Sequence, residues 1–243
     1  MTISLEGKKV LVTGGCRGIG AAITLAMARA GADVIACYRS GGDHVDALAT
    51  RLDETPGKYH LTRADVTSSA DIAALVQECR DRLGSLDVLV NNAGVISHIP
   101  FAELKLEEWQ RVVDTNLTSV FAMVQAALPL LSGNSSVISI GSGSAFVGLA
   151  LRAHYTATKA GLVGLSRSMS RELGPRGIRV NVISPGVIQT EKELSDEIVA
   201  KYTAMTSAGR LGRPDEIANV AVFLASDLSS YISGADIDAN GGI

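Results

Sequence analysis

VLVTGGCRGIG, residues 10–20, decides the fold of this 243-residue chain. Its first residues are apolar and predict a buried strand, while Gly14, Gly18 and Gly20 predict a sharp turn. A helical pattern over residues 19–30 follows directly. A strand, a glycine turn and a helix N-terminus together form a site for a dinucleotide pyrophosphate, because free backbone amides point at the anion. An ordinary glycine-rich turn is the alternative interpretation of this stretch alone.

Strand-length apolar runs alternate with helical patterns along the whole chain. The predicted strands cover residues 9–13, 33–38, 59–63, 86–91, 136–140, 179–184 and 235–238. The predicted helices cover residues 19–30, 45–52, 70–83, 106–131, 154–173 and 214–225. Gly31 and Gly174 follow two of these helices, where a left-handed residue is often needed. The strands are continuous apolar runs, as expected for strands covered on both faces. The sequence therefore predicts a single α/β domain over residues 1–243, with a doubly wound, parallel, seven-stranded sheet and helices on both faces, the Rossmann fold.

Residues 189–213 interrupt the alternation of strands and helices. They follow Pro185-Gly186 and carry only weak strand signals. We expect this segment to form a substrate flap beside the site, with a plain surface helix as the alternative.

Composition excludes several classes of protein. The formal net charge of -3 gives no general attraction for nucleic acid or anionic membrane. The longest apolar stretch, near residues 120–131, is far too short to span a bilayer. Cys16, Cys37 and Cys79 cannot all pair within one chain, which indicates a reducing, cytoplasmic location. Neither the cysteines nor the four histidines have metal-ligand spacing, so no metal site is expected.

The end of the second predicted strand indicates which dinucleotide is bound. Many NAD enzymes carry an acidic residue there, which accepts a hydrogen bond from the ribose 2′-OH. This chain has Cys37-Tyr38-Arg39-Ser40 instead, without an acid. Arg17 and Arg39 can both face a 2′-phosphate, which suits the guanidinium fork. The sequence therefore predicts NADP(H), with two solvated arginines as the alternative.

Tyr155 and Lys159 supply the expected chemistry. Residues four apart share one face of a helix, and a nearby positive charge favours the phenolate. A free phenol has a pKa of about 10, so Lys159 together with a cationic nicotinamide is expected to lower it toward the range useful for proton transfer. Ser142 follows the fifth strand, where ligands bind in open α/β sheets. Asn116 lies inside a helical pattern that disfavours asparagine, which indicates a bend or a polar role. Alone, the tyrosine and lysine would more often be a surface pair.

The combined motifs resemble those of the short-chain dehydrogenase/reductase family over nearly the whole chain. The matching residues are Thr13-Gly14-x-x-x-Gly18-x-Gly20, Asp65, Asn91-Asn92-Ala93-Gly94, Asn116, Ser142, Tyr155-x-x-x-Lys159 and Pro185-Gly186. Within the family, the stretch from Gly209 to Glu216 and the C-terminal Asn240-Gly241-Gly242 are most similar to bacterial 3-oxoacyl-carrier-protein reductases and related ketoreductases.

The resemblance implies a catalytic tetrad. Tyr155 would donate a proton to a ketone oxygen and Ser142 would hydrogen-bond that oxygen. Lys159 would bind the nicotinamide ribose, and Asn116 would hold a relay water. The residues expected to contact NADP(H) are Gly14, Cys16, Arg17, Gly18, Ile19, Gly20, Arg39, Ser40, Asp65, Val66, Asn92, Ala93, Gly94, Tyr155, Lys159, Pro185, Gly186, Ile188 and Thr190. The resemblance also implies a homotetramer built on the helices at 106–131 and 154–173 and on the C-terminal region.

Two departures from the family pattern affect the expected partners. Residues 128–134 contain no basic residue, although relatives that act on carrier-bound substrates usually carry basic residues there, so docking of an acidic carrier protein is expected to be weak. Cys16 replaces a hydroxyl residue that is common in the glycine turn. We therefore predict an NADPH-dependent reductase of a small-molecule ketone. The alternatives are an NAD-dependent alcohol dehydrogenase and a catalytically silent cofactor-binding scaffold.

Overall fold

A parallel sheet with the strand order β3-β2-β1-β4-β5-β6-β7 runs through the computed structural model, which describes residues 3–190 and 195–243. The described strands are β1 Lys9–Thr13, β2 Asp33–Tyr38, β3 Tyr59–Arg63, β4 Leu86–Asn91, β5 Leu131–Ile140, β6 Arg179–Pro185 and β7 Asp236–Ala239. The order reverses between β1 and β4, and this is where a doubly wound sheet opens a crevice at the carboxyl ends of its strands.

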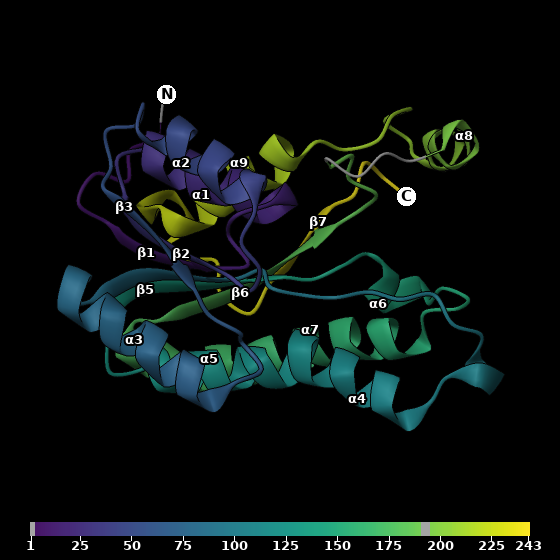
Figure 1. Cartoon of the computed structure of the whole chain (residues 1–243), viewed down its shortest axis with the longest axis horizontal. Coiled ribbons are helices and arrows are strands. Elements are labelled where there is room, and N and C mark those ends of the chain that lie inside the picture. Colours follow the sequence, from purple (N-terminus) through teal and green to yellow (C-terminus); the bar gives the residue numbers. More distant parts are fainter. Residues whose placement is uncertain (1–2, 191–194) are drawn as a thin grey trace.

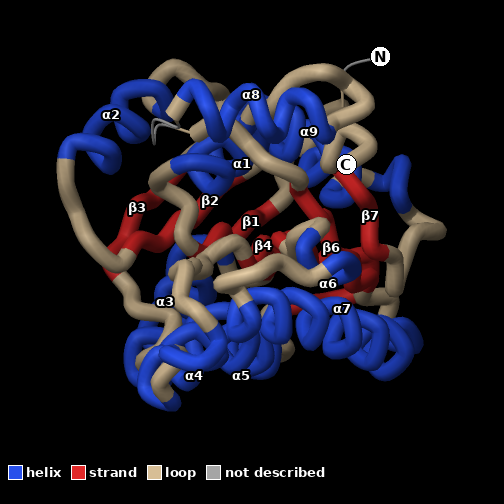
Figure 2. The backbone as a smooth tube through the Cα atoms, turned by 90° about the vertical axis from the view of Figure 1, so that its right-hand side faces the viewer, coloured by secondary structure: helices blue, strands red, loops and turns tan. Residues whose placement is uncertain are grey.

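Helices cover both faces of the sheet, as Figures 1 and 2 show. One face carries α1 Gly18–Arg29, α2 Asp43–Leu52 and α9 Pro214–Ala225. The other face carries α3 Ser69–Leu83, α4 Leu106–Val113, α5 Ser119–Ala127 and α7 Ala153–Leu173. Two helices, α6 Ser144–Val147 and α8 Asp196–Met205, lie toward the carboxyl edge. Short 3-10 turns cover Phe101–Glu103, Gly174–Arg176 and Asp227–Ser229, and a π-helical turn covers Asp114–Thr118.

The apolar strands explain why both faces must be covered. Successive side chains of a strand point to opposite faces. Val10 and Val12 belong to the core beneath α1 and α9, whereas Leu11 between them belongs to the core beneath α3 and α5. All three side chains are fully buried. The predicted fold class is therefore confirmed.

The long helix predicted over residues 106–131 is wrong in two places. The π-helical turn Asp114–Thr118 separates α4 from α5, and the helical region ends at Ala127. Pro129 cannot continue a helix, because it lacks an amide proton and its ring clashes with the preceding turn. Strand β5 begins at Leu131, five residues before the predicted start, because Leu131 pairs with Leu86 ahead of an irregularity that places the extra residues in β5.

The left-handed residue predicted at Gly174 is also wrong. Gly174 has a φ of -53° and begins a 3-10 turn, whereas the left-handed residue is Gly177, with a φ of 75°. Gly31 does have a positive φ, of 96°. In the region 189–213 the structure contains α8, which agrees with the surface-helix alternative. Residues 191–194 lie outside the described part, and a flap role for the segment stays a prediction.

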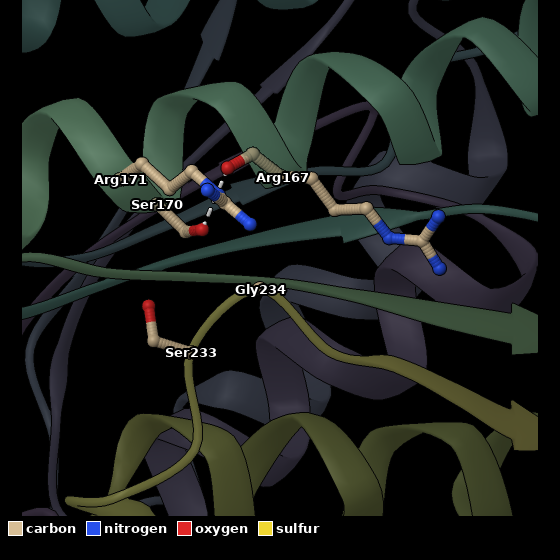
Figure 3. Close-up of a pocket in the computed structure, with 5 residues that line it drawn as sticks. All are labelled: Arg167, Ser170, Arg171, Ser233 and Gly234. Atoms are coloured by element: carbon tan, nitrogen blue, oxygen red, sulfur yellow. Dashed lines mark hydrogen bonds between the residues drawn. The ribbon is translucent and has the colours of Figure 1, made fainter.

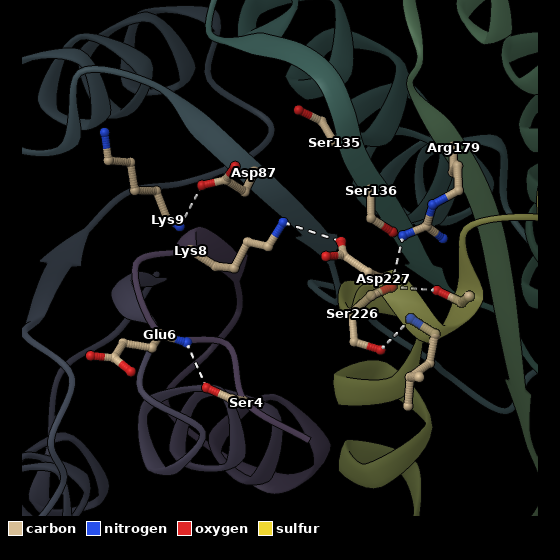
Figure 4. Close-up of polar contacts among 12 residues, drawn as sticks. Ser4, Glu6, Lys8, Lys9, Asp87, Ser135, Ser136, Arg179, Ser226 and Asp227 are labelled. Atoms are coloured by element: carbon tan, nitrogen blue, oxygen red, sulfur yellow. Dashed lines mark hydrogen bonds and ion pairs between the residues drawn. The ribbon is translucent and has the colours of Figure 1, made fainter. Parts of the chain in front are cut away.

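Polar contacts fasten the amino-terminal edge of the sheet, opposite the crevice (Figure 4). The backbone amide of Lys9 donates to Asp87 at 2.8 Å, and the Lys8 ammonium lies 3.5 Å from the Asp227 carboxylate. The Arg179 guanidinium donates to the carbonyl oxygen of Leu224 at 2.8 Å. These contacts join β1 to β4 and connect β1 and β6 to the end of α9 and the turn after it. The carboxyl edge of the sheet remains as the place for a ligand. Within the described residues, no helix has both the length and the apolar character needed to cross a membrane.

Candidate active site

A cleft of about 600 Å³ opens at the carboxyl edge beside the start of α1. Fourteen of the predicted cofactor contacts line it: Gly14, Cys16, Arg17, Gly18, Ile19, Gly20, Arg39, Ser40, Asp65, Val66, Asn92, Ala93, Gly94 and Thr190. Six lining residues were not predicted from the sequence: Tyr38, His44, Ala64, Val95, Ile96 and Thr115. Pro185, Gly186 and Ile188 lie at the end of β6, outside this lining.

The glycine turn is shaped so that only glycine fits. A Cβ on Gly20 would lie 2.1 Å from the carbonyl oxygen of Gly14 and 2.4 Å from Asn92 Nδ2. Gly14 itself has a φ of 60°. Asn92 Nδ2 donates to the carbonyl oxygens of Thr13 and Gly14, at 3.1 and 2.8 Å. The turn therefore lies flat against β4 in front of the first amides of α1, and this shape suits a pyrophosphate.

Two arginines line the cleft, and a third contacts the backbone of one of them. Arg17 and Arg39 are exposed and line it, as the sequence predicted. Arg63, which sequence reasoning missed, donates from Nε to the carbonyl oxygen of Arg39 at 3.1 Å and so holds the backbone that follows β2. None of the three forms an ion pair with another described residue. Arg17 and Arg39 therefore give the cleft a positive rim suited to a phosphate, and Arg63 holds the backbone of Arg39.

Asp65 has a local structural task as well as a place on the cleft. Its Oδ1 accepts hydrogen bonds from the backbone amide and the hydroxyl of Thr67, at 2.9 and 2.7 Å. This arrangement fixes the turn before α3. An adenine contact by Asp65 stays a prediction.

The predicted catalytic pair lies on the first turns of α7. Lys159 Nζ donates to the carbonyl oxygen of Ile140 at 2.7 Å and lies 5.6 Å from the centre of the Tyr155 ring. Burial lowers the pKa of the Lys159 ammonium to about 8. Burial also raises the pKa of Tyr155, although a hydrogen bond with Ser142 and the charge of Arg152 act in the lowering direction. Burial is the largest effect on the Tyr155 pKa, and the lowering expected from Lys159 together with a cationic nicotinamide stays a prediction.

Ser142 and Asn116 complete the predicted set. The Ser142 hydroxyl lies 2.9 Å from that of Ser144, at the start of α6. Asn116 sits in the π-helical turn, where the widened backbone directs its amide toward Val95. Its Oδ1 accepts from the Val95 amide at 2.8 Å, and its Nδ2 donates to the Val95 carbonyl at 2.9 Å and to Thr158 at 3.3 Å. The polar role expected of Asn116 is confirmed by these hydrogen bonds, and its water-holding role stays a prediction.

The end of β6 closes the site toward the C-terminus. A Cβ on Gly186 would lie 2.8 Å from Asn240 Cα, so this glycine permits close passage of the C-terminal segment. The Gly143 amide donates to the Pro185 carbonyl at 3.1 Å, and Ile188 pairs with Gly212 in a short bridge. These contacts bring Pro185, Gly186 and Ile188 toward the loop that carries Ser142.

The three cysteines are free, and burial raises the pKa of each thiol. Cys16 borders the cleft, yet it is only 2% exposed and packs into the core. Its thiol is therefore poorly placed to replace a hydroxyl contact to phosphate. Residues 3–190 and 195–243 contain no group of three or more His, Cys, Asp or Glu side chains that could hold a metal ion.

Comparison with known proteins identifies the family. The family model described as enoyl-(acyl carrier protein) reductase matches residues 14–243. The chain belongs to the short-chain dehydrogenase/reductase family. It is 40% identical to the 3-oxoacyl-acyl-carrier-protein reductase FabG of Escherichia coli K12, over 99% of both chains, and 38% identical to that of Aquifex aeolicus, over 100% of both.

Solved structures agree with this assignment. A short-chain dehydrogenase/reductase from Serratia marcescens superposes with a TM-score of 0.94 at 36% identity, covering 98% of each chain. A blue fluorescent protein from a metagenomic library, solved in complex with NADPH, superposes with a TM-score of 0.93 at 35% identity, also covering 98% of each chain.

Proposed function

We propose that the protein reduces a ketone to a secondary alcohol with NADPH, and that its substrate is a 3-oxoacyl thioester or a ketone of similar shape. One observation carries this proposal: Ser142, Tyr155 and Lys159 converge at the carboxyl edge, beside a cleft shaped for a dinucleotide. The curated relatives that act on 3-oxoacyl groups support the substrate class.

Each catalytic side chain has one task in this mechanism. NADPH, when bound, supplies the hydride that adds to the carbonyl carbon. Tyr155 donates its phenolic proton to the carbonyl oxygen, and Ser142 hydrogen-bonds the same oxygen and orients it. Lys159 can turn its ammonium from the Ile140 carbonyl toward a ribose hydroxyl and the Tyr155 oxygen. Positioned proton donors of this kind contribute about 10²- to 10⁴-fold to the rate.

The choice of NADPH over NADH rests on the arginine rim. Arg17 and Arg39 border the cleft without carboxylate partners among the described residues, and Arg63 braces the Arg39 backbone. A structural relative with 35% identity binds NADPH. An NAD-dependent alcohol dehydrogenase would be expected to place an acid at this rim to accept from the ribose 2′-OH.

Apolar side chains around the site suit an acyl chain. The segment between Ser142 and Tyr155 carries four exposed apolar side chains: Phe146, Val147, Leu149 and Leu151, which are 59%, 76%, 37% and 47% exposed. Such a group of exposed apolar side chains is typical of a surface that binds an apolar ligand. The chemistry therefore fits a ketone with an alkyl or acyl substituent.

Docking of an acidic carrier protein has weaker support. Arg176 donates to the carbonyl oxygens of Leu128 and Leu131, so its guanidinium is already engaged. Arg167 and Arg171 remain available, beside Ser170 and Ser233 in a surface pocket on the second half of α7 (Figure 3). Arg171 lies sixteen residues beyond Tyr155 on this helix, which is about 24 Å along its axis.

The test is a kinetic comparison of substrates and cofactors. We expect the purified protein to oxidise NADPH when given a short 3-oxoacyl thioester of N-acetylcysteamine, faster than with NADH and faster than with the matching 2-enoyl thioester. Tyr155→Phe removes only the hydroxyl, so kcat should fall by at least about 10²-fold while NADPH affinity changes little. Tyr231→Phe, at a fully exposed tyrosine, is the matched control and should keep wild-type activity.

Each other outcome would select a different function. Reduction of the enoyl thioester alone would replace ketone reduction with enoyl reduction. Preferential oxidation of alcohols with NAD would favour the dehydrogenase, and NADPH binding without any turnover would favour the silent scaffold. The same acyl group presented on an acidic carrier protein measures docking: Arg171→Glu should then lower kcat/KM for the carrier-bound substrate only.

A further inference from the structure

An extended segment of residues 95–100, here named the substrate segment, joins the end of β4 to the turn before α4. Its residues alternate in exposure. Val95, Ser97 and Ile99 are half-buried, whereas Ile96, His98 and Pro100 are exposed. This alternation is that of an extended chain with one face held against the protein. No strand of the described sheet pairs with the segment, so other contacts must fix its register.

Each inward-facing residue of the segment is held by hydrogen bonds to another part of the chain. Val95 is held through its amide and carbonyl by Asn116. The Ile99 amide donates to the carbonyl oxygen of Leu151, in the loop before α7, at 2.9 Å. Between them, the Ser97 hydroxyl contacts both Glu108 on α4 and His154 on α7. The middle tie therefore joins the substrate segment to the residue directly before Tyr155.

The proton positions in this middle tie follow from chemistry. Arg111 contacts Glu108 through two nitrogens, both at 2.6 Å, and this pairing lowers the pKa of the Glu108 carboxyl to about 2. Glu108 is therefore ionised and can only accept a hydrogen bond. The single Ser97 proton must go to Glu108, so Ser97 Oγ accepts from His154 Nε2–H at 2.7 Å.

His154 is committed to this contact. Its side chain is completely buried, and its Nδ1 has no hydrogen-bond partner among the described residues. A buried polar atom without a partner is costly, so a purely structural core residue here would more readily be apolar. We therefore assign the His154 imidazole, between α4 and α7, the task of donating its Nε2–H to Ser97.

The same proton positions exclude a hydrolytic triad. A serine nucleophile needs a base that accepts its proton, and the carboxylate must lie on the far side of the histidine. Here the serine stands between the two other groups and donates to the carboxylate. The histidine acts as a donor, so Ser97 is not activated for attack.

We propose that Glu108, Ser97 and His154 form a positioning chain that holds the substrate segment in register with Tyr155. This inference rests on the proposed function. In this proposal, none of the three groups touches the reacting atoms. Each acts only by holding the substrate segment in position. A misplacement of about 1 Å at a reacting pair can cost about 10²-fold in rate.

Two single variants and their combination test the chain. Ser97→Ala and His154→Leu should each lower kcat/KM for the 3-oxoacyl thioester at least about tenfold, mainly through kcat. The dissociation constant for NADPH should change less than about twofold. The double variant should lose no more than the worse single variant, because both break one chain. His154→Gln places an amide N–H near the position of Nε2 and should restore at least part of the loss.

A second measurement does not depend on turnover. Hydrogen exchange of the amides in residues 95–99 should be at least about tenfold faster in Ser97→Ala and His154→Leu than in the wild type. Ser168→Ala, at an exposed serine on α7, is the matched control and should change neither readout. If no substrate is turned over, the proposed function fails, while the exchange data still decide whether the tie exists.

Unchanged exchange in both variants would overturn the proposal. Losses of kcat/KM that multiply in the double variant would also overturn it, because they would show independent effects. So would a loss that follows only the fraction of unfolded protein, or faster exchange with unchanged kcat/KM. Where His154→Leu does not fold, Ser97→Ala and His154→Gln carry the same comparison.

Discussion

Gly20→Ala is the substitution for which local helix preference and the structure predict opposite results. Gly20 lies in the first turn of α1, and alanine exceeds glycine in helix preference by about 1 kcal/mol. In this structure, however, the new Cβ would lie 2.1 Å from the Gly14 carbonyl oxygen, about 0.9 Å inside a tolerable 3.0 Å. The atom in its way belongs to the backbone, so no side chain can rotate aside.

The clash also breaks the tie that shapes the turn. Gly14 O is the oxygen that accepts from Asn92 Nδ2 at 2.8 Å, and Asn92 Nδ2 would itself lie 2.4 Å from the new methyl group. Moving Gly14 away by about 1 Å lengthens this hydrogen bond beyond useful range, which costs roughly 1–3 kcal/mol for the buried groups left unpaired. That cost outweighs the helix preference, and it displaces the amides expected to face the pyrophosphate. We therefore expect NADPH affinity to fall by at least about tenfold.

The assay is a titration of NADPH fluorescence, together with thermal unfolding of the protein without cofactor. Gly174→Ala is the matched control: Gly174 has right-handed helical angles and no atom within 4 Å of an added Cβ. It should keep NADPH affinity; no gain in stability is expected, because the ring of Pro175 disfavours helical angles in a preceding residue with a Cβ. A Gly20→Ala protein that binds NADPH as tightly as the wild type would refute the argument about the glycine turn.

Three further predictions concern charge and assembly. Arg39→Asp should lower NADPH affinity roughly ten- to a hundred-fold and spare NADH, because charged contacts are worth about 1.5–3 kcal/mol; the check is kcat/KM with both cofactors, and an unchanged ratio would contradict the assigned rim. Burial lowers the pKa of Lys159 from 10.5 to about 8, so the unfolded chain keeps this proton to a higher pH than the folded chain does. The contribution of Lys159 to the free energy of unfolding should therefore rise between about pH 8 and pH 10.5 and stay constant below pH 8. Urea unfolding at pH 7 and pH 10 measures this change: the free energy of unfolding should rise by up to about 3 kcal/mol more in the wild type than in Lys159→Met. The same change with pH in both proteins would disprove the prediction. Sedimentation should give a homotetramer, because the exposed Phe121 on α5, 49% accessible, and the apolar helices beside it need a partner; a monomer at micromolar concentration would be inconsistent.

Continuous apolar runs made most of the fold predictable. Strands β1 to β4 begin and end at the predicted residues, because each is bounded by a turn or a change to polar residues. The region 106–131 was misjudged because local pattern alone cannot show a π-helical turn. Pro129 and the serines after it carried a signal for the end of the helix, but the pairing of Leu131 with Leu86 depends on contacts between distant residues.

The site was predictable where a residue type is bound to one task. The glycines of the turn, Asn92 and Arg39 fall where their chemistry required, at the carboxyl edge. Residues that act through distant partners gave no such signal. Arg63, for instance, reaches the Arg39 carbonyl only because β3 pairs with β2. Ser97, Glu108 and His154 are far apart in sequence and polar in unremarkable patterns, so only the packing of α4 against α7 reveals their contact.

The two catalytic pKa shifts have a joint consequence for the direction of the reaction. Burial raises the pKa of Tyr155 and lowers that of Lys159, so in each case it favours the uncharged form. A tyrosine that stays protonated at neutral pH is the form a proton donor requires, which suits reduction of a ketone. Oxidation of an alcohol would instead need the phenolate, which this pocket disfavours until a positive charge arrives. The oxidised cofactor, when bound, would supply such a positive charge and would favour loss of the Tyr155 proton in the proposed mechanism. In the proposed mechanism, burial of the pair therefore favours the protonated Tyr155 that a proton donor to a ketone requires.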